Sequence, residues 1–207
     1  MRTGIILAGG KSTRFRTDKA LALLDGKPLV RWVAEALSGV TDELVISVAS
    51  RKDGNRCASA IGRGVKIAVD SSAGIGPIAG LLSSFSISSG DYVAVAPCDA
   101  PFIKPALYEL LFEMVKGKDG AVPKIGENYE PLIAVYRRIA MLDALKKVLS
   151  EGKSRPVNAY RYIDIAAVSE KEIRKIDSTL GSFINVNTKE DLRRFARAFK
   201  TQFLFLL

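Results

Sequence analysis

Histidine is absent from the 207 residues of this chain. Without an imidazole, the protein has no Ser-His-Asp or Cys-His catalytic arrangement, no imidazole acid–base catalysis and no histidine-ligated zinc. Any metal chemistry must use oxygen ligands, which points to magnesium or a similar hard cation. Carboxylates are therefore the residues to consider first as metal ligands.

Cysteine and long apolar runs are also scarce. Cys57 and Cys98 are the only cysteines, and their spacing fits neither a metal site nor a redox motif. No apolar run approaches the length of a membrane span, and residues 1–20 lack the features of a signal peptide. We therefore expect a cytoplasmic protein without a membrane partner. The length and the 48% hydrophobic content suit one globular domain, residues 1–207.

Acidic residues are outnumbered by basic ones, 22 against 31, so the formal net charge is +9. This balance favours anionic partners such as nucleotides, phosphorylated metabolites or nucleic acid. Nucleic acid is disfavoured, because the basic residues lack the interleaved aromatic side chains of single-strand binding surfaces. Charge alone does not separate the other classes.

The opening residues contain the densest group of polar features. Ile5-Ile6-Leu7 predicts a buried strand that ends at Gly9-Gly10. A basic loop follows, with four cations against one acid: Lys11, Arg14, Arg16 and Lys19 against Asp18. Glycines let a ligand approach the backbone, and clustered cations suit a polyphosphate. The spacing matches neither a Walker A loop nor a dinucleotide fingerprint, so a P-loop kinase and a dehydrogenase are disfavoured.

Apolar strands alternate with amphipathic helices along the chain. We predict further strands at 43–48, 65–69, 91–96, 120–122, 132–136 and 160–168, and helices at 28–38, up to about 88, at 103–116 and at 139–149. Residues 51–64 suit a loop or a short helix. A short strand from residue 182 should lead into a last helix capped by Asn187 or Thr188. This order predicts an α/β fold, a single-domain three-layer α/β/α arrangement with a mainly parallel, Rossmann-like mixed sheet.

Three polar clusters each follow a predicted strand: residues 9–19, 70–80 and 97–101. Because ligands of such folds sit at the carboxyl ends of the strands, the clusters should meet at one edge of the sheet. Asp99, held between two prolines, is either a turn former or a magnesium ligand on a polyphosphate, and we favour the ligand. Asp70 could bind a ribose hydroxyl, support the metal or simply end its strand.

Lys19 and Arg14 are the candidate catalytic cations. Both would neutralise phosphate charge in the transition state of a transfer reaction.

These residues resemble nucleotidyltransferases of the nucleotide-diphospho-sugar transferase fold. The shared opening motifs are Leu7-Ala-Gly-Gly-Lys-Ser-Thr-Arg-Phe15, Asp18-Lys-Ala-Leu21 and Gly26-Lys-Pro-Leu29. Three later motifs narrow the resemblance to the molybdenum cofactor guanylyltransferase family: Gly76-Pro-Ile-Ala-Gly80, Pro97-Cys-Asp99 and Asn185-Val-Asn-Thr-Lys-Glu-Asp-Leu192.

The resemblance implies GTP as substrate, molybdopterin or the molybdenum cofactor as acceptor, and Mg²⁺ as cofactor. It places a set of residues on the nucleotide: the backbone of Leu7, Ala8 and Gly9 with neighbouring Gly10, the phosphate ligand Lys19, and Asp70 in the GTP site. Asp99 would bind both magnesium and GTP. Residues 1–116 would form the nucleotide-binding half, and residues 117–200 the acceptor-binding half with the closing helix.

The chain also departs from that family at several positions. Arg16 stands at a usual glycine, and Glu130-Pro131 replaces a Gln-Pro pair. Ser50, which we include among the candidate nucleotide-binding residues, replaces an asparagine expected to contact the base or ribose. Alternatives therefore stay open: transfer to cobinamide phosphate or a sugar phosphate, use of CTP, or a non-catalytic module that binds nucleotide or nucleic acid. A homo-oligomer also stays open, and the apolar tail 203–207 should pack on the body or on a second subunit.

Overall fold

The structure, a computed structural model, describes residues 1–9, 19–62, 64–70 and 76–204, with side chains up to Arg197. Predictions for Gly10, Arg14 and Arg16, and for the packing of the apolar tail, therefore lie outside the described residues. Among the helices described, none combines the length and apolar character that a membrane crossing needs.

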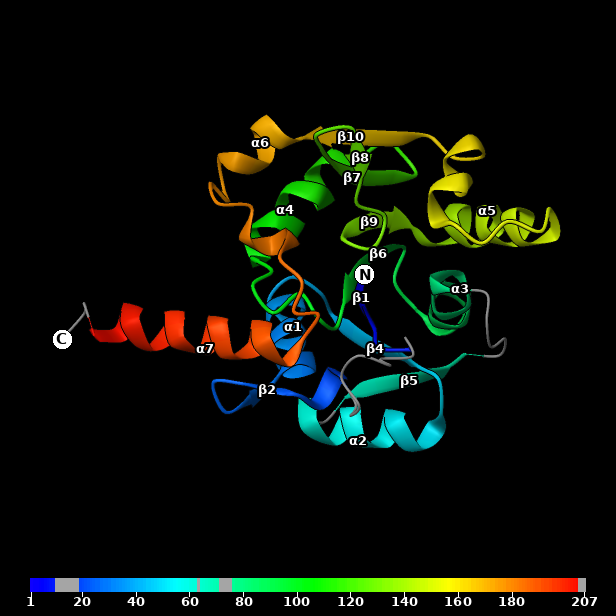
Figure 1. The fold of residues 1–207 in the computed structure, drawn as a ribbon. Coiled ribbons are helices and arrows are strands. Elements are labelled where there is room, and N and C mark those ends of the chain that lie inside the picture. The colour runs from blue at the N-terminus through cyan, green and yellow to red at the C-terminus, as the bar shows by residue number, and fades with distance from the viewer. Residues whose placement is uncertain (10–18, 63, 71–75, 205–207) are drawn as a thin grey trace.

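A sheet of eight strands forms the centre of the fold (Figure 1). Its strands are β1 (Arg2–Leu7), β4 (Glu43–Val48), β5 (Val65–Val69), β6 (Tyr92–Pro97), β7 (Gly120–Ile125), β8 (Asn128–Tyr129), β9 (Ala134–Arg137) and β10 (Ile165–Ser169). The order is β10-β7-β9-β6-β1-β4-β5, and β8 pairs with β7. Most neighbours are parallel, whereas β9 runs antiparallel to β6 and β7. The predicted mainly parallel mixed sheet is confirmed.

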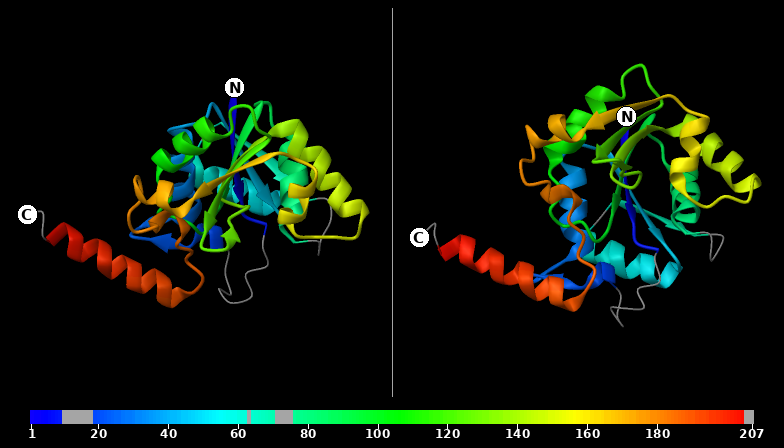
Figure 2. Two further views of the ribbon diagram at one scale, coloured as in Figure 1. Left: turned by 90° about the horizontal axis from the view of Figure 1, so that it is seen from above. Right: turned by 45° about the horizontal axis from the view of Figure 1, so that its top comes forward.

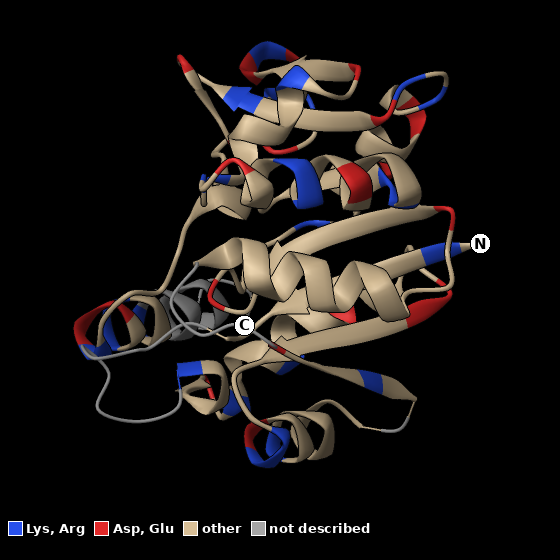
Figure 3. Cartoon of the chain, turned by 90° about the vertical axis from the view of Figure 1, so that its right-hand side faces the viewer, with Lys and Arg blue, Asp and Glu red and all other residues tan. Residues whose placement is uncertain are grey.

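Helices cover both faces of this sheet (Figure 2). On one face lie α1 (Leu29–Ser38), α2 (Arg51–Ile61) and α4 (Pro105–Met114), and on the other α3 (Pro77–Ile87) and α5 (Arg138–Ser150). Ile5 packs into one core and Ile6 into the other, and both are fully buried. Burial on both faces explains why the strands are continuous apolar runs rather than alternating ones. Figure 3 shows that charged residues gather on the helices and strand ends.

The remaining elements are short, apart from the last helix. They are η1 (Lys19–Leu21), the hairpin of β2 (Leu23–Leu24) and β3 (Lys27–Pro28), η2 (Pro156–Arg161), α6 (Glu170–Arg174), η3 (Gly181–Phe183) and α7 (Lys189–Leu204). Figures 1 and 2 show α7 extending away from the body.

Residues 51–61 form a helix, which settles the ambiguous prediction for 51–64. Ser50 caps this helix, since its Oγ accepts a hydrogen bond from Asp53 N at 3.1 Å. Gly54 lies inside the helix at a position with no room for a side chain, because a Cβ there would come within 2.4 Å of Ile67 Cγ2. Gly54, a residue type that disfavours helices, is thus a packing requirement at this position.

Two predicted strands need correction. The first part of 160–168 belongs to η2, and the strand itself is β10 (Ile165–Ser169). The strand expected from residue 182 does not form, because buried Asp177 captures Ser182 N at 2.8 Å and bends the backbone into η3. The predicted cap of the last helix is confirmed at Thr188, whose Oγ1 accepts from Asp191 N at 3.0 Å.

Candidate active site

Three strand ends meet at one edge of the sheet, as the positions of the polar clusters predicted. Backbone hydrogen bonds continue past the strands: Cys98 N donates to Leu7 O at 3.0 Å, and Ala8 N donates to Ser47 O at 2.8 Å. Asp70 N donates to Val48 O at 2.9 Å. These bonds hold Leu7 and Ala8, at the end of β1, between the turn that carries Asp99 and the end of β4, and they join the end of β4 to Asp70.

Lys19 and Asp99 form an ion pair between Nζ and Oδ2. Lys19 comes from η1 and Asp99 from the turn after β6, and their side chains are 17% and 18% exposed. A pair so well shielded from water interacts more strongly than a surface pair. The structure therefore brings the predicted phosphate ligand into contact with the predicted metal ligand.

Asn187 also belongs to this cluster, although sequence reasoning did not assign it to the site. Its Oδ1 accepts a hydrogen bond from Lys19 Nζ at 2.9 Å. The segment before α7 is docked on the turn by Val186 N, which donates to Asp99 O at 2.8 Å. Asp191 Oδ2 accepts from the amides of Asn187 and Thr188, both at 2.9 Å. The asparagine-rich motif before α7 was the signal that could have identified it.

The carboxylate of Asp191 is adapted to this capping role. Burial by itself would raise its pKa, but the hydrogen bonds from the two backbone amides and from Thr188 lower it below the usual value. The ionised Asp191 carboxylate therefore caps α7 and holds in place the segment that carries Asn187.

Asp70 follows β5 directly and faces Gly9. A Cβ at Gly9 would come within 2.4 Å of Asp70 Oδ2, so a side chain there would force this carboxylate to move. Its other oxygen, Oδ1, accepts from Ser47 Oγ at 2.8 Å and from Ser83 Oγ at 3.2 Å. The two serines were not predicted, although Ser47 could have been noticed as a hydroxyl in an otherwise apolar strand.

Ser50 has a structural task in addition to any contact with a ligand. Its hydroxyl caps α2 and donates to Asp53 Oδ2 at 2.6 Å. The predicted contact of Ser50 with a nucleotide stays a prediction.

The described residues contain no cluster of three or more His, Cys, Asp or Glu side chains suited to a metal ion. Magnesium is commonly held by one or two carboxylates together with phosphate oxygens, an arrangement that does not require such a cluster.

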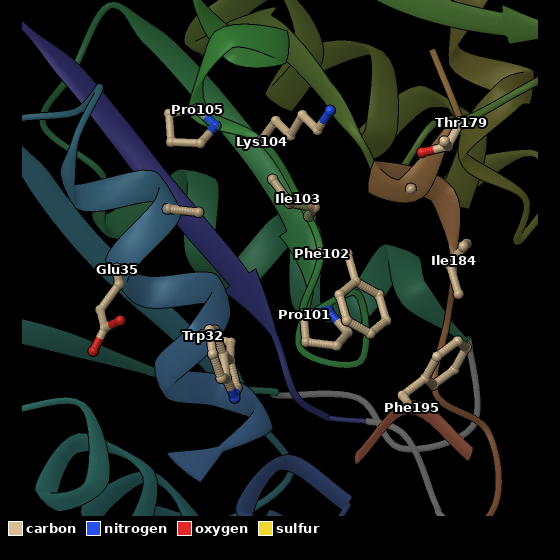
Figure 4. Close-up of a pocket in the computed structure, with 12 residues that line it drawn as sticks. Trp32, Glu35, Pro101, Phe102, Ile103, Lys104, Pro105, Thr179, Ile184 and Phe195 are labelled. Carbon is tan, nitrogen blue, oxygen red and sulfur yellow. The ribbon is translucent and has the colours of Figure 1, made fainter. Parts of the chain in front are cut away.

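A pocket of about 670 Å³ lies on the α1 side of the turn 101–105. Figure 4 shows Trp32 facing Phe102 and Phe195 across it. The rings of Phe102 and Phe195 meet edge to face, 4.9 Å apart. Lys19 and Asp99 do not line this apolar pocket, so it is distinct from the charged cluster.

The sequence profile described as "MobA-like NTP transferase domain" matches residues 4–164. The chain belongs to this family.

Curated relatives of this MobA-like chain agree on one activity by name. A probable molybdenum cofactor guanylyltransferase of Natronomonas pharaonis is 38% identical over 93% of this chain and 96% of its own length. One of Pelotomaculum thermopropionicum is 34% identical over 92% of this chain and 89% of its own length.

A solved structure of a similarly named protein has the same fold as this chain. Molybdopterin-guanine dinucleotide biosynthesis protein A from Archaeoglobus fulgidus superposes with a TM-score of 0.81 at 28% identity. The alignment covers 97% of this chain and all of the other. The similarity thus extends beyond the profile match into the last part of the chain.

Proposed function

We propose that this protein transfers GMP from GTP to the phosphate of molybdopterin or its molybdenum form and releases pyrophosphate. The observation that carries the proposal is the contact of Lys19 with Asp99 at the edge where Gly9 and Asp70 also meet. The names of the curated relatives and of the similar solved structure support the choice of GTP and acceptor.

The loop after β1 would bind the nucleotide with its backbone, at Leu7, Ala8, Gly9 and Gly10. The absence of a side chain at Gly9 allows a close approach of the nucleoside to the Asp70 carboxylate. Cytoplasmic GTP is the donor in this proposal.

The chemistry requires charge neutralisation more than proton transfer. A phosphate oxygen of the acceptor attacks the α-phosphorus of GTP, the bond to the bridging oxygen of the β-phosphate breaks, and pyrophosphate leaves with that oxygen. The acceptor phosphate is already ionised near neutral pH, so no general base is needed, in keeping with a chain that lacks histidine. Lys19 and Arg14 would offset the negative charge that gathers on the phosphates.

Magnesium is part of the proposal, with Asp99 as its protein ligand. The donor set fits this ion, because a carboxylate and phosphate oxygens are hard ligands. A bound magnesium ion would withdraw charge from the phosphates and orient them. Asp99 would hold the ion, and Lys19, now paired with Asp99, would contact phosphate.

Pyrophosphate release, measured for each NTP with each acceptor, tests the function. We expect pyrophosphate release from GTP with molybdopterin as acceptor in the presence of Mg²⁺. We expect little release when CTP is the donor, or when cobinamide phosphate or a sugar phosphate is the acceptor. Asp99→Asn should abolish turnover, whereas Asp143→Asn, on the exposed outer face of α5, is the control and should not. Equal release with CTP, or full turnover by Asp99→Asn, would contradict the proposal.

A further inference from the structure

Asp70 is oriented by hydroxyls from two different elements. Ser47 comes from β4 and Ser83 from α3, and both reach the same oxygen, Oδ1. Asp70 is itself partly exposed, and no hydrogen bond from a described residue reaches its other oxygen. The two serines therefore occupy one oxygen and leave Oδ2, the oxygen beside Gly9, for an incoming donor.

Ser47 is the stronger of the two partners. Ser47 as a whole is 1% exposed, and a hydroxyl buried in a sheet needs a hydrogen-bond acceptor. Asp70 Oδ1, at 2.8 Å, is the acceptor found for it. Gly80 on α3 makes the room, because a Cβ there would come within 2.5 Å of Ser47 Oγ.

Ser83 is the weaker partner because its single proton is divided between two acceptors. Its Oγ lies 3.2 Å from Asp70 Oδ1 and 3.1 Å from Gly80 O. Loss of the Ser83 hydroxyl should therefore matter less than loss of the Ser47 hydroxyl.

We propose that Ser47 and Ser83 are positioning residues for nucleotide selection: they hold Asp70 by Oδ1, so that Oδ2 accepts a hydrogen bond from an N–H or O–H donor of the nucleoside. The inference rests on the proposed function, because it assumes that the edge beside Gly9 binds a nucleoside triphosphate. It adds Ser47 and Ser83, which would not touch the nucleotide themselves but would orient Asp70, which would.

The test is direct titration of the protein with nucleotide by calorimetry, without acceptor. GTP, ATP, CTP and UTP are compared first, and the tightest is used for all variants. We expect Ser47→Ala to weaken binding roughly 10-fold and Ser83→Ala roughly threefold, as for lost hydrogen bonds to a charged group. Ser83→Thr keeps the hydroxyl and should restore binding.

Ser84 offers a matched control beside Ser83. Its Oγ is buried on the same helix and has no hydrogen-bond partner among the described residues. Ser84→Ala should therefore leave nucleotide binding unchanged. The proposal is overturned if Ser47→Ala and Ser83→Ala both bind nucleotide like Ser84→Ala, or if no nucleotide binds to the wild type.

A double-mutant cycle separates positioning from a merely structural role. If Ser47 acts through Asp70, Ser47→Ala should add no further loss in an Asp70→Asn background. Additive losses would contradict the proposal.

Analogues identify the donor. If GTP is the ligand, inosine triphosphate lacks the 2-amino group, and 2′-deoxy- and 3′-deoxy-GTP each lack a ribose hydroxyl. Each analogue should bind the wild type more weakly than GTP if it lacks the donor group. The analogue whose loss of affinity relative to GTP disappears in Asp70→Asn identifies the donor. If Asp70→Asn leaves this loss unchanged for every analogue, the proposal is overturned. Binding of GTP without guanylyl transfer would contradict the proposed function alone.

Discussion

Glu43 should make the stability of this protein depend on pH in the acid range. It lies at the start of β4, with its side chain 7% exposed, and binds Lys66 of β5. Its Oε2 also accepts from Thr3 Oγ1 at 2.7 Å and from Ser89 N at 2.9 Å. Burial alone would raise its pKa, but these hydrogen bonds outweigh burial and lower the pKa from 4.5 to about 2.

The size of the effect follows from this shift. A pKa lowered from 4.5 to about 2 corresponds to about 3 kcal/mol of folding free energy. Because the pKa is lower in the folded state, this stability is present above about pH 4.5 and is lost as the pH falls towards about 2. Glu43→Gln should therefore cost roughly 2–3 kcal/mol at pH 7 and much less at pH 3.

Urea denaturation between pH 7 and pH 3 measures this directly. Glu113→Gln is the control, because the Glu113 side chain is 61% exposed and its one ion pair within the described part of the chain is a surface pair with Lys116. Wild type and Glu113→Gln should lose stability together as the pH falls, whereas Glu43→Gln should lose about 2 kcal/mol less. Parallel curves for all three proteins would refute the reasoning.

Three further changes probe the site and its support. Gly9→Ala would place a Cβ 2.4 Å from Asp70 Oδ2 and force this carboxylate to move, so nucleotide binding measured by calorimetry should weaken at least 10-fold; unchanged binding would contradict the close approach. Lys19→Met should lower kcat roughly 100-fold with little effect on the melting temperature, and an active variant would remove Lys19 from the mechanism. Asp177→Ala, which leaves the amide of Ser182 unsatisfied, should cost about 2–3 kcal/mol in urea denaturation, and a cost below 0.5 kcal/mol, roughly the size of a surface substitution, would refute this reason for η3.

The strands of the first half were predictable because the sheet is buried on both faces. An apolar run such as 43–48 then marks a strand almost to the residue. The meeting of Lys19 with Asp99, 80 residues apart, followed from the rule that strand ends share an edge. Patterns of this kind depend on residues near one another in the sequence, or on topology alone.

The features that were missed depend on contacts between distant residues. Ser47 meets Asp70, 23 residues away, and Asn187 meets Lys19, 168 residues away. The failed strand near residue 182 has a different cause, because the contact of Ser182 with Asp177 spans only five residues and is made by a turn that apolar periodicity does not reveal. No local periodicity encodes such contacts.

Transfer of label from α-labelled GTP to molybdopterin is the measurement that tests the central proposal most directly. The proposal predicts one labelled product per pyrophosphate released, dependence on Mg²⁺, and a loss of at least 100-fold in Asp99→Asn. Labelled GTP that stays unchanged in the presence of molybdopterin and Mg²⁺, or an Asp99→Asn variant as active as the wild type, would contradict it.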